Sequence, residues 1–237
     1  GTREVTNGEF RRFRPTHASG FIGKRTLDLD LLPVTSVTWA DAVEYCNWLS
    51  EQEGLPPAYE KKDGKWTLRR PVGTGYRLPT EAEWEFAARG GLKDKPFVWG
   101  DEERPDGKIM SNHWQGKFPE RDSGADGFTS VAPVKSFAPN GYGLYDISGN
   151  VWEMCEDWYG LDYYKVSPKD GPIGPAIGHD PEKTGFGQHV IRGGSWLCDE
   201  GYCLRYRATS RKGLDTLTST NHVGFRCVAD LPAPSTK

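Results

Sequence analysis

Apolar positions recur with a helical period in three short stretches of the chain. Each stretch follows a Ser/Thr-x-x-Glu/Asp capping box, in which the first and fourth residues bond to each other's backbone amides. The boxes begin at Thr6, Thr38 and Thr80. They predict helices that run to about residues 13, 50 and 89, and the pair Gly90-Gly91 is expected to stop the third.

The rest of the chain has short apolar runs without sustained alternation. The runs at residues 131–137, 143–147, 190–192 and 224–229 are candidate strands. Residues 52–75 and 160–188 are rich in Gly, Pro and charge, which is typical of surface loops. No repeat or interdomain linker divides the sequence. We therefore expect a single domain of α+β class, with few short helices and strands and much irregular loop.

Composition fits a folded, loop-rich protein. Of 237 residues, 36% are hydrophobic and 12% aromatic, which argues against disorder, while 29 Gly and 17 Pro require many turns. The net charge of −3 lacks the basic excess of a nucleic-acid-binding protein. No apolar run approaches the roughly 20 residues of a membrane span. The five His and five Cys show no conventional zinc-site spacing.

A set of ordered motifs carries a family resemblance. In chain order they are Glu4-Val5-Thr6-Asn7 with Phe10, Arg77-Leu78-Pro79-Thr80-Glu81-Ala82-Glu83-Trp84-Glu85, Trp99-Gly100, Asn140-Gly141-Tyr142-Gly143-Leu144-Tyr145-Asp146, Gly149-Asn150-Val151-Trp152-Glu153, Arg192-Gly193-Gly194-Ser195 and Gly224-Phe225-Arg226-Cys227. They span nearly the whole chain and resemble the formylglycine-generating enzyme (sulfatase-modifying factor) family.

The resemblance implies one sulfatase-modifying-factor domain over residues 1–237, with a decorated C-type-lectin-like fold. The sequence departs from the family ahead of Glu4, where the usual Gly-rich strand segment does not occur. The sheet is therefore expected to lack strands or to recruit others. Because this fold also carries binding proteins and inactive paralogues, function has to be argued from the site.

Cys198 and Cys203 stand at the spacing of the family's two active-site cysteines. Soft thiolates select Cu(I). A five-residue step suits neither a helix face nor a strand face, so a turn is needed, and Gly201 could supply it. The resemblance implies that the two thiolates hold Cu(I) linearly and that the substrate cysteine joins as a third ligand. With dioxygen, that cysteine becomes formylglycine through a thioaldehyde. A short structural disulfide is the alternative.

The residues around this pair are candidates for the remaining roles. Ser195 is expected either to orient dioxygen or water as a catalytic residue, or to cap backbone amides. Asp199 and Glu200 replace neutral or cationic groups of the family, and they would favour an Arg-bearing peptide or simply be solvated. The resemblance places Trp152 beside the groove, although tryptophan is more commonly a packing anchor. The expected substrate contacts are Trp152, Asp199, Tyr202 and Arg205.

The resemblance also implies two structural calcium sites. The first would use the side chains of Asn112 and Asp126 with the carbonyls of His113 and Phe128. The second would use the side chains of Asp146 and Glu153 with the carbonyls of Gly149 and Val151. Oxygen ligands in Gly-containing loops suit Ca²⁺, whereas turn formation is the alternative role of these Asn and Asp residues.

Cys46 and Cys227 match two positions that the vertebrate archetype joins in a disulfide. Such a bond would close a loop of about 180 residues, worth roughly 5 kcal/mol in chain entropy. The alternative is a pair of buried free thiols in a cytosolic protein. A disulfide and calcium favour an exported, extracytoplasmic protein over a cytoplasmic one.

Three functions follow from these observations. The first is a copper-dependent oxidase acting on a Cys-x-Pro-x-Arg peptide of an unfolded sulfatase, with the protein as a monomer. The second is a non-catalytic peptide- or ligand-binding protein of the same fold. The third, a non-haem iron sulfoxide synthase, ranks last because that chemistry requires an additional His-rich helical domain.

Overall fold

The three capping boxes form where the sequence predicts them. The computed structural model describes residues 1–178, 187–201 and 203–230. Its α-helices are α1 (Asn7–Phe13), α2 (Trp39–Gln52) and α3 (Glu81–Arg89), capped by Thr6, Thr38 and Thr80 through reciprocal bonds with the residue three positions on. Helix α3 ends at Gly90, whose φ of 55° is left-handed and suits glycine.

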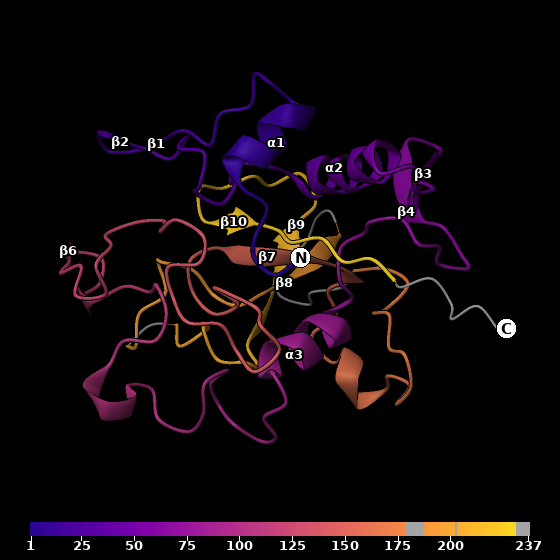
Figure 1. Cartoon of the computed structure of the whole chain (residues 1–237). Coiled ribbons are helices and arrows are strands. Elements are labelled where there is room, and N and C mark those ends of the chain that lie inside the picture. Colours follow the sequence, from indigo (N-terminus) through magenta and orange to yellow (C-terminus); the bar gives the residue numbers. More distant parts are fainter. Residues whose placement is uncertain (179–186, 202, 231–237) are drawn as a thin grey trace, which may run out of the picture.

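A four-stranded sheet forms the centre of the molecule (Figure 1). Its order is β10 (Val223–Gly224), β7 (Trp152–Trp158), β8 (Gln188–Arg192) and β9 (Arg211–Asp215). Strand β7 pairs in parallel with β10 and antiparallel with β8, which in turn pairs antiparallel with β9. Helices α1 and α2 lie on one side of this sheet in the view, and α3 lies on the other.

Alternate residues of the central strands enter two separate cores. Met154 and Ile191 join the cluster that contains the buried face of α2. Their neighbours Cys155 and Val190 join the cluster around Trp84 of α3. Because both faces of β7 and β8 are covered, these strands are buried along most of their length and show no polar alternation.

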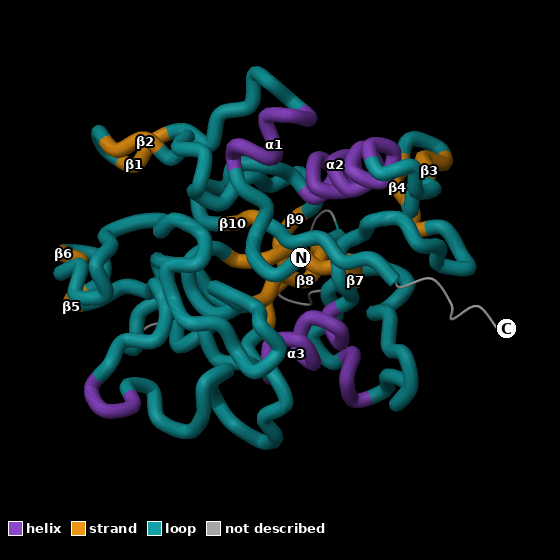
Figure 2. Tube along the Cα trace, viewed as in Figure 1, coloured by secondary structure: helices purple, strands orange, loops and turns teal. Residues whose placement is uncertain are grey.

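Most of the remaining chain is loop, as composition suggests (Figure 2). Short antiparallel hairpins join β1 (Phe21–Ile22) to β2 (Arg25–Thr26), β3 (Tyr59–Lys62) to β4 (Lys65–Leu68), and β5 (Gly116–Lys117) to β6 (Arg121–Asp122). Two 3₁₀ turns, η1 (Pro105–Gly107) and η2 (Tyr163–Lys165), complete the described elements. No helix of the described ranges is long and apolar enough to cross a membrane.

Several strand predictions were wrong. Residues 131–137 and 143–147 are not strands, because Lys135, Gly143 and Asp146 adopt left-handed φ angles of 67°, 78° and 51°, which an extended strand excludes. Only the start of the 224–229 run enters the sheet, although Val228 forms an isolated bridge with Arg77. The 52–75 stretch contains the β3–β4 hairpin, whose Tyr59 is buried.

Candidate functional site

Cys198 and Cys203 meet across a tight turn. Their Sγ atoms lie 2.8 Å apart, and both residues are free thiols. The Asp199 carbonyl closes the turn by accepting from the amides of Cys203 and Leu204, at 3.0 and 3.1 Å. The turn that the five-residue step required is therefore present, and it includes Gly201.

The buried member of the pair is anchored to the body of the protein. The Cys198 amide donates to the Ser195 carbonyl at 2.9 Å, and the Cys198 carbonyl accepts from the Trp114 amide at 2.9 Å. Ser195 is fully buried, and its hydroxyl lies at the Cys198 thiol, where it favours the thiolate. Cys203 is partly exposed, so a substrate would meet this sulfur first.

The two thiols differ in their readiness to ionise. Hydrogen bonding with Cys198 lowers the pKa of Cys203 to about 7, and the positive charges of Arg205 and Lys212 act in the same direction. Hydrogen bonding with Cys203 and then burial raise the pKa of Cys198. The exposed sulfur therefore has thiolate character near neutral pH, which is the form that binds a soft metal.

The donors at this turn suit Cu(I), although their spacing does not yet match a bound ion. Two thiolates are the soft ligands that Cu(I) prefers. A metal–sulfur bond of about 2.3 Å would require the two sulfurs to lie farther apart than 2.8 Å. Cys203, the more exposed partner, has more room to move. Copper binding would therefore open the pair without changing its ligands.

The expected substrate contacts occupy different environments. Trp152 is 4% exposed and lies in the same core cluster as Cys198, so it offers a peptide almost no surface. Asp199 is also buried, whereas Arg205 is partly exposed beside Cys203. Tyr202 lies outside the described residues.

A hollow of about 710 Å³ opens beside the cysteine turn. Asp199, Glu200 and Gly201 of the turn form one part of its wall. Trp114 and Phe118, whose rings pack edge to face, also line it, and the buried Trp114 indole N–H has no partner among the described residues. The hollow therefore has an aromatic surface on one side.

In the first predicted calcium site, one carboxylate oxygen of Asp126 is available to bind a cation. Its Oδ1 accepts from the Phe128 amide at 2.9 Å, and its Oδ2 is buried without a hydrogen-bond partner in the described chain. Burial raises the pKa of Asp126. The Asn112 amide nitrogen donates to the Ser130 carbonyl at 2.9 Å, which leaves the Asn112 oxygen as an acceptor. These residues fit a cation that accepts the unpaired carboxylate oxygen.

The side chains of the second calcium set already have protein partners. Asp146 accepts from the backbone amides of Lys135 and Phe137. Glu153 accepts from the buried guanidinium of Arg226 and, at 2.7 Å, from the Trp84 indole. A cation here would share these oxygens with their present donors.

Glu4, which the sequence did not indicate as a site residue, adds a third carboxyl to this buried group. Its Oε1 accepts from Asn150 at 3.0 Å, and its Oε2 is buried without a described partner. Burial, followed by the charge of Asp146, raises the pKa of Glu4 well above its ordinary range. Three carboxyl groups thus lie near the buried guanidinium of Arg226, and a bound cation would favour the ionised form of Glu4.

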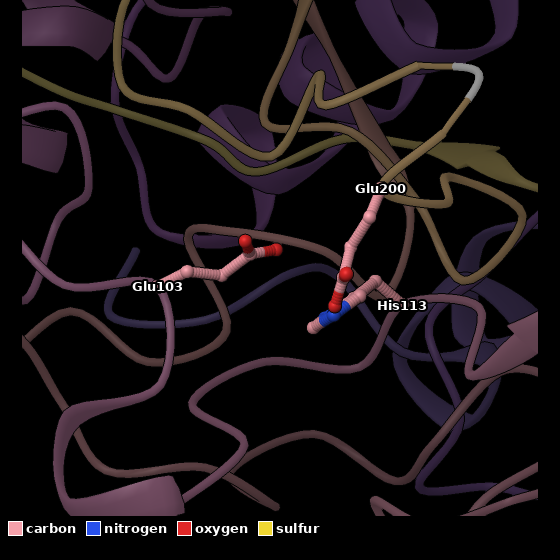
Figure 3. A group of neighbouring side chains, drawn as sticks. All are labelled: Glu103, His113 and Glu200. Carbon is pink, nitrogen blue, oxygen red and sulfur yellow. The ribbon is translucent and has the colours of Figure 1, made fainter.

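The sequence did not indicate the Glu103 carboxylate or the His113 imidazole as site groups, although both lie near the cysteine turn. Glu103 and the imidazole of His113 approach Glu200 of the turn (Figure 3). His113 entered the sequence analysis only for its backbone carbonyl. The three residues are far apart along the chain and share no motif, so no local signal connects them.

Comparison with known proteins assigns the chain to a family. The family model for the sulfatase-modifying factor enzyme 1-like domain matches residues 1–231. A relative from Thermomonospora curvata named formylglycine-generating enzyme is 44% identical over 200 residues, which cover 84% of this chain and 55% of the relative. A mouse relative named inactive C-alpha-formylglycine-generating enzyme 2 is 36% identical over 206 residues, covering 86% and 51%. The chain spans about half the length of these relatives.

A solved structure supports the fold independently. Treponema denticola variable protein 1 superposes with a TM-score of 0.72 at 30% sequence identity, covering 94% of this chain and 81% of that one. The mixed α+β architecture with short elements is therefore confirmed.

Proposed function

The chain belongs to the sulfatase-modifying factor family, and from this we propose that it is a copper-dependent oxidase that converts a peptidyl cysteine to Cα-formylglycine. The substrate would be a Cys-x-Pro-x-Arg stretch of an unfolded sulfatase. The observation that carries the proposal is the convergence of two thiols, 2.8 Å apart, with one buried and one accessible.

Three residues of the cysteine turn and its anchor would have distinct roles in the reaction. Cys198 and Cys203 would hold the ion, with the Ser195 hydroxyl stabilising the buried thiolate. Bound Cu(I) would supply the reaction with dioxygen. In the overall reaction the substrate would lose one hydrogen from Cβ and one from sulfur, water would then supply the carbonyl oxygen at Cβ, and the sulfur would leave as sulfide. Reducing dioxygen to water takes four electrons, of which the substrate provides two and an external thiol reductant the others.

The hollow beside the turn would receive the peptide. The rings of Trp114 and Phe118 can pack on apolar side chains of the peptide. Asp199 and Glu200 place negative charge at one wall, while Arg104 and Lys117 also line the hollow and Arg104 pairs with Glu200. The Arg of the peptide would therefore compete with Arg104 for the Glu200 carboxylate.

A binding protein without turnover is the second candidate. The inactive mouse relative shows that members of this family can lack the activity, and it shares 36% identity with the chain. Copper binding separates the two candidates, because an inactive binder has no need of a two-thiolate copper site.

Supporting ions and bonds complete the proposal. Ca²⁺ would bind at the unpaired oxygen of Asp126 and, in a second site, at Asp146 and Glu153 next to Glu4, stiffening the loops that carry them. Cys46 and Cys227 would form a disulfide, which, like calcium, suits an extracytoplasmic location. The protein would act as a monomer.

Anaerobic Cu(I) titration against a competing chelator tests the proposal directly. We expect one ion per chain, bound through both thiols, so that Cys198→Ser and Cys203→Ser each abolish tight binding. Cys155→Ser is the matched control, because Cys155 is a buried free thiol in the other core. The loaded protein then receives the peptide, a thiol reductant and air. Peptide mass should fall by the amount that replaces SH and one hydrogen with an aldehyde oxygen.

The outcomes distinguish the candidates. Copper bound through both thiols with peptide conversion supports the oxidase. If all three variants bind Cu(I) as the parent does, the two-thiol site does not exist. The oxidase proposal is then wrong, and the non-catalytic binding protein becomes the favoured function.

A further inference from the structure

Three side chains from separate segments converge next to the cysteine turn. Glu103, His113 and Glu200 each contribute one potential ligand atom, and these atoms all lie within 4.8 Å of one another. Figure 3 shows the two carboxylates reaching toward the imidazole. Glu200 belongs to the cysteine turn, whereas Glu103 precedes η1 and His113 precedes β5.

The imidazole of His113 has one ring nitrogen bonded to the backbone and the other without a hydrogen-bond partner in the described chain. Its Nδ1 lies 3.0 Å from the Ser111 carbonyl, which can only accept, so Nδ1 carries the hydrogen. Its Nε2 is then an acceptor, and it is buried without a hydrogen-bond partner in the described chain. Burial lowers the pKa of His113, which keeps the ring neutral. The side chain is 1% exposed, so this unused acceptor is costly unless a ligand occupies it.

The surroundings hold these three groups in place. The His113 ring stacks on Tyr206 with centroids 4.3 Å apart, and the Tyr206 hydroxyl donates to Glu103. The guanidinium of Arg104 donates to Glu200. A histidine whose second nitrogen donates to a backbone carbonyl, with carboxylates that are themselves hydrogen-bonded, is the usual arrangement around a protein-bound metal.

We propose that His113 Nε2 and one carboxylate oxygen each from Glu103 and Glu200 bind a divalent transition-metal ion of the zinc type. One imidazole and two carboxylates form a common donor set for such an ion, whereas Ca²⁺ takes oxygen ligands alone. The three donors leave a fourth position for water. Arg104 bonds to one Glu200 oxygen, so the other oxygen would be the one that binds the ion.

The ion would connect the cysteine turn to the rest of the protein. Glu200 lies two residues after Cys198, in the segment whose closing bonds fix the thiol pair. An ion that links Glu200 to Glu103 and His113 would restrict the movement of the cysteine turn, which lines the hollow. This role is a positioning one and does not depend on the copper chemistry proposed above.

Metal titration of a background without the Cys198 and Cys203 thiols, and with Cys46 and Cys227 oxidised to a disulfide, tests the site. In protein carrying Cys198→Ser and Cys203→Ser, with excess Ca²⁺ to occupy oxygen-ligand sites, we expect one Co²⁺ per chain. The visible d–d bands of bound Co²⁺ report its coordination, and Zn²⁺ should displace it. Glu200→Gln and Glu103→Gln should each weaken Co²⁺ binding at least about tenfold, because even a lost outer-shell partner commonly costs that much.

Glu102→Gln is the matched control. It removes one negative charge beside Glu103 from an exposed side chain that is outside the proposed ligand set, and it should leave Co²⁺ affinity unchanged. Glu200 is also largely exposed, so Glu200→Gln should fold normally. The proposal is overturned if the background protein binds no Co²⁺, or if both ligand variants bind it as Glu102→Gln does.

Discussion

The Sγ atoms of Cys46 and Cys227 lie 3.6 Å apart, although 181 positions separate the residues along the chain. Cys46 projects from α2, and Cys227 follows β10, so the contact links a helix to the segment beyond the edge of the central sheet. Both are buried free thiols in this structure. The two thiols are close enough that oxidation could form the disulfide that the family resemblance implies.

Mild oxidation should join this pair. In the Cys198→Ser, Cys203→Ser background, peptide mapping is expected to find a Cys46–Cys227 bond. Unfolding by denaturant should show that the oxidised form is more stable than the reduced form by up to about 5 kcal/mol, since the closed loop is long. Cys227→Ser should abolish the difference and Cys155→Ser should preserve it. Equal stability of both redox forms of the background protein would contradict the prediction.

Removing the charge of Glu81 should destabilise the fold. Glu81 is buried and receives the guanidinium groups of Arg192 and Arg211, each at 2.7 Å. Glu81→Gln removes the carboxylate that Arg192 and Arg211 share, although Arg192 keeps its pair with Glu85 at 2.6 Å. Breaking a buried pair typically costs about 3 to 5 kcal/mol, and the remaining pair places this loss at the lower end. Urea unfolding measures this loss. Glu120→Gln, which breaks an exposed pair with Lys117, should cause no measurable change; a similar effect of both variants would refute the argument.

The contribution of Glu156 to stability should fall as pH rises toward 8, opposite in sign to that of the buried histidines His189 and His222, whose pKa values are lowered. Burial raises the pKa of Glu156 from 4.5 to about 8, so the folded protein keeps a proton that the unfolded chain releases at lower pH. The favourable contribution is complete below about pH 4.5 and is lost as pH approaches the folded-state pKa. Urea unfolding between about pH 5 and 8 should show a smaller decline for Glu156→Gln than for the parent.

Part of that decline will remain in Glu156→Gln, because burial also raises the pKa of Asp157 to about 7. Adding Asp157→Asn should therefore flatten the profile further. Identical slopes for the parent and the double variant would show that these carboxyls do not cause the pH dependence.

Calcium should raise the thermal stability of the protein through Asp126. Asp126→Asn keeps an oxygen that can accept from the Phe128 amide but removes the charge that a cation would neutralise. We expect the increase in Tm on adding Ca²⁺ to shrink in this variant. Asp101→Asn, at an exposed carboxylate paired with Lys95, provides the control and should respond as the parent does. An undiminished increase in Asp126→Asn would exclude this site.

Local sequence signals predicted the helices better than the strands. A capping box is a short-range device, so Thr6, Thr38 and Thr80 were sufficient to locate three helix starts. Strand β7 went unpredicted because burial on both faces removes the alternation that identifies a strand. Strand β9 is largely polar, since only its Gly213 is buried, and it therefore lacked an apolar run.

In the candidate site, too, residues within one motif could be predicted, whereas contacts between distant segments could not. Cys198 and Cys203 could be predicted because both lie within one motif. The approach of Glu103 to His113 and Glu200 depends on how three loops pack, and Glu4 reaches the Asp146 carboxyl group only through the tertiary fold. Contacts between distant loops leave no periodicity or spacing in a single sequence.

His113 stands between the two proposed ion sites. Its backbone belongs to the expected calcium set, and Asp126 lies at its amide, while its imidazole faces Glu103 and Glu200. One residue would thus serve two ions through opposite ends. Thermodynamic linkage then requires that, whatever factor Zn²⁺ imposes on the affinity for Ca²⁺, Ca²⁺ imposes the same factor on the affinity for Zn²⁺. The neighbouring Trp114 amide bonds to the Cys198 carbonyl, so the segment shared by the two ion sites also contacts the cysteine turn.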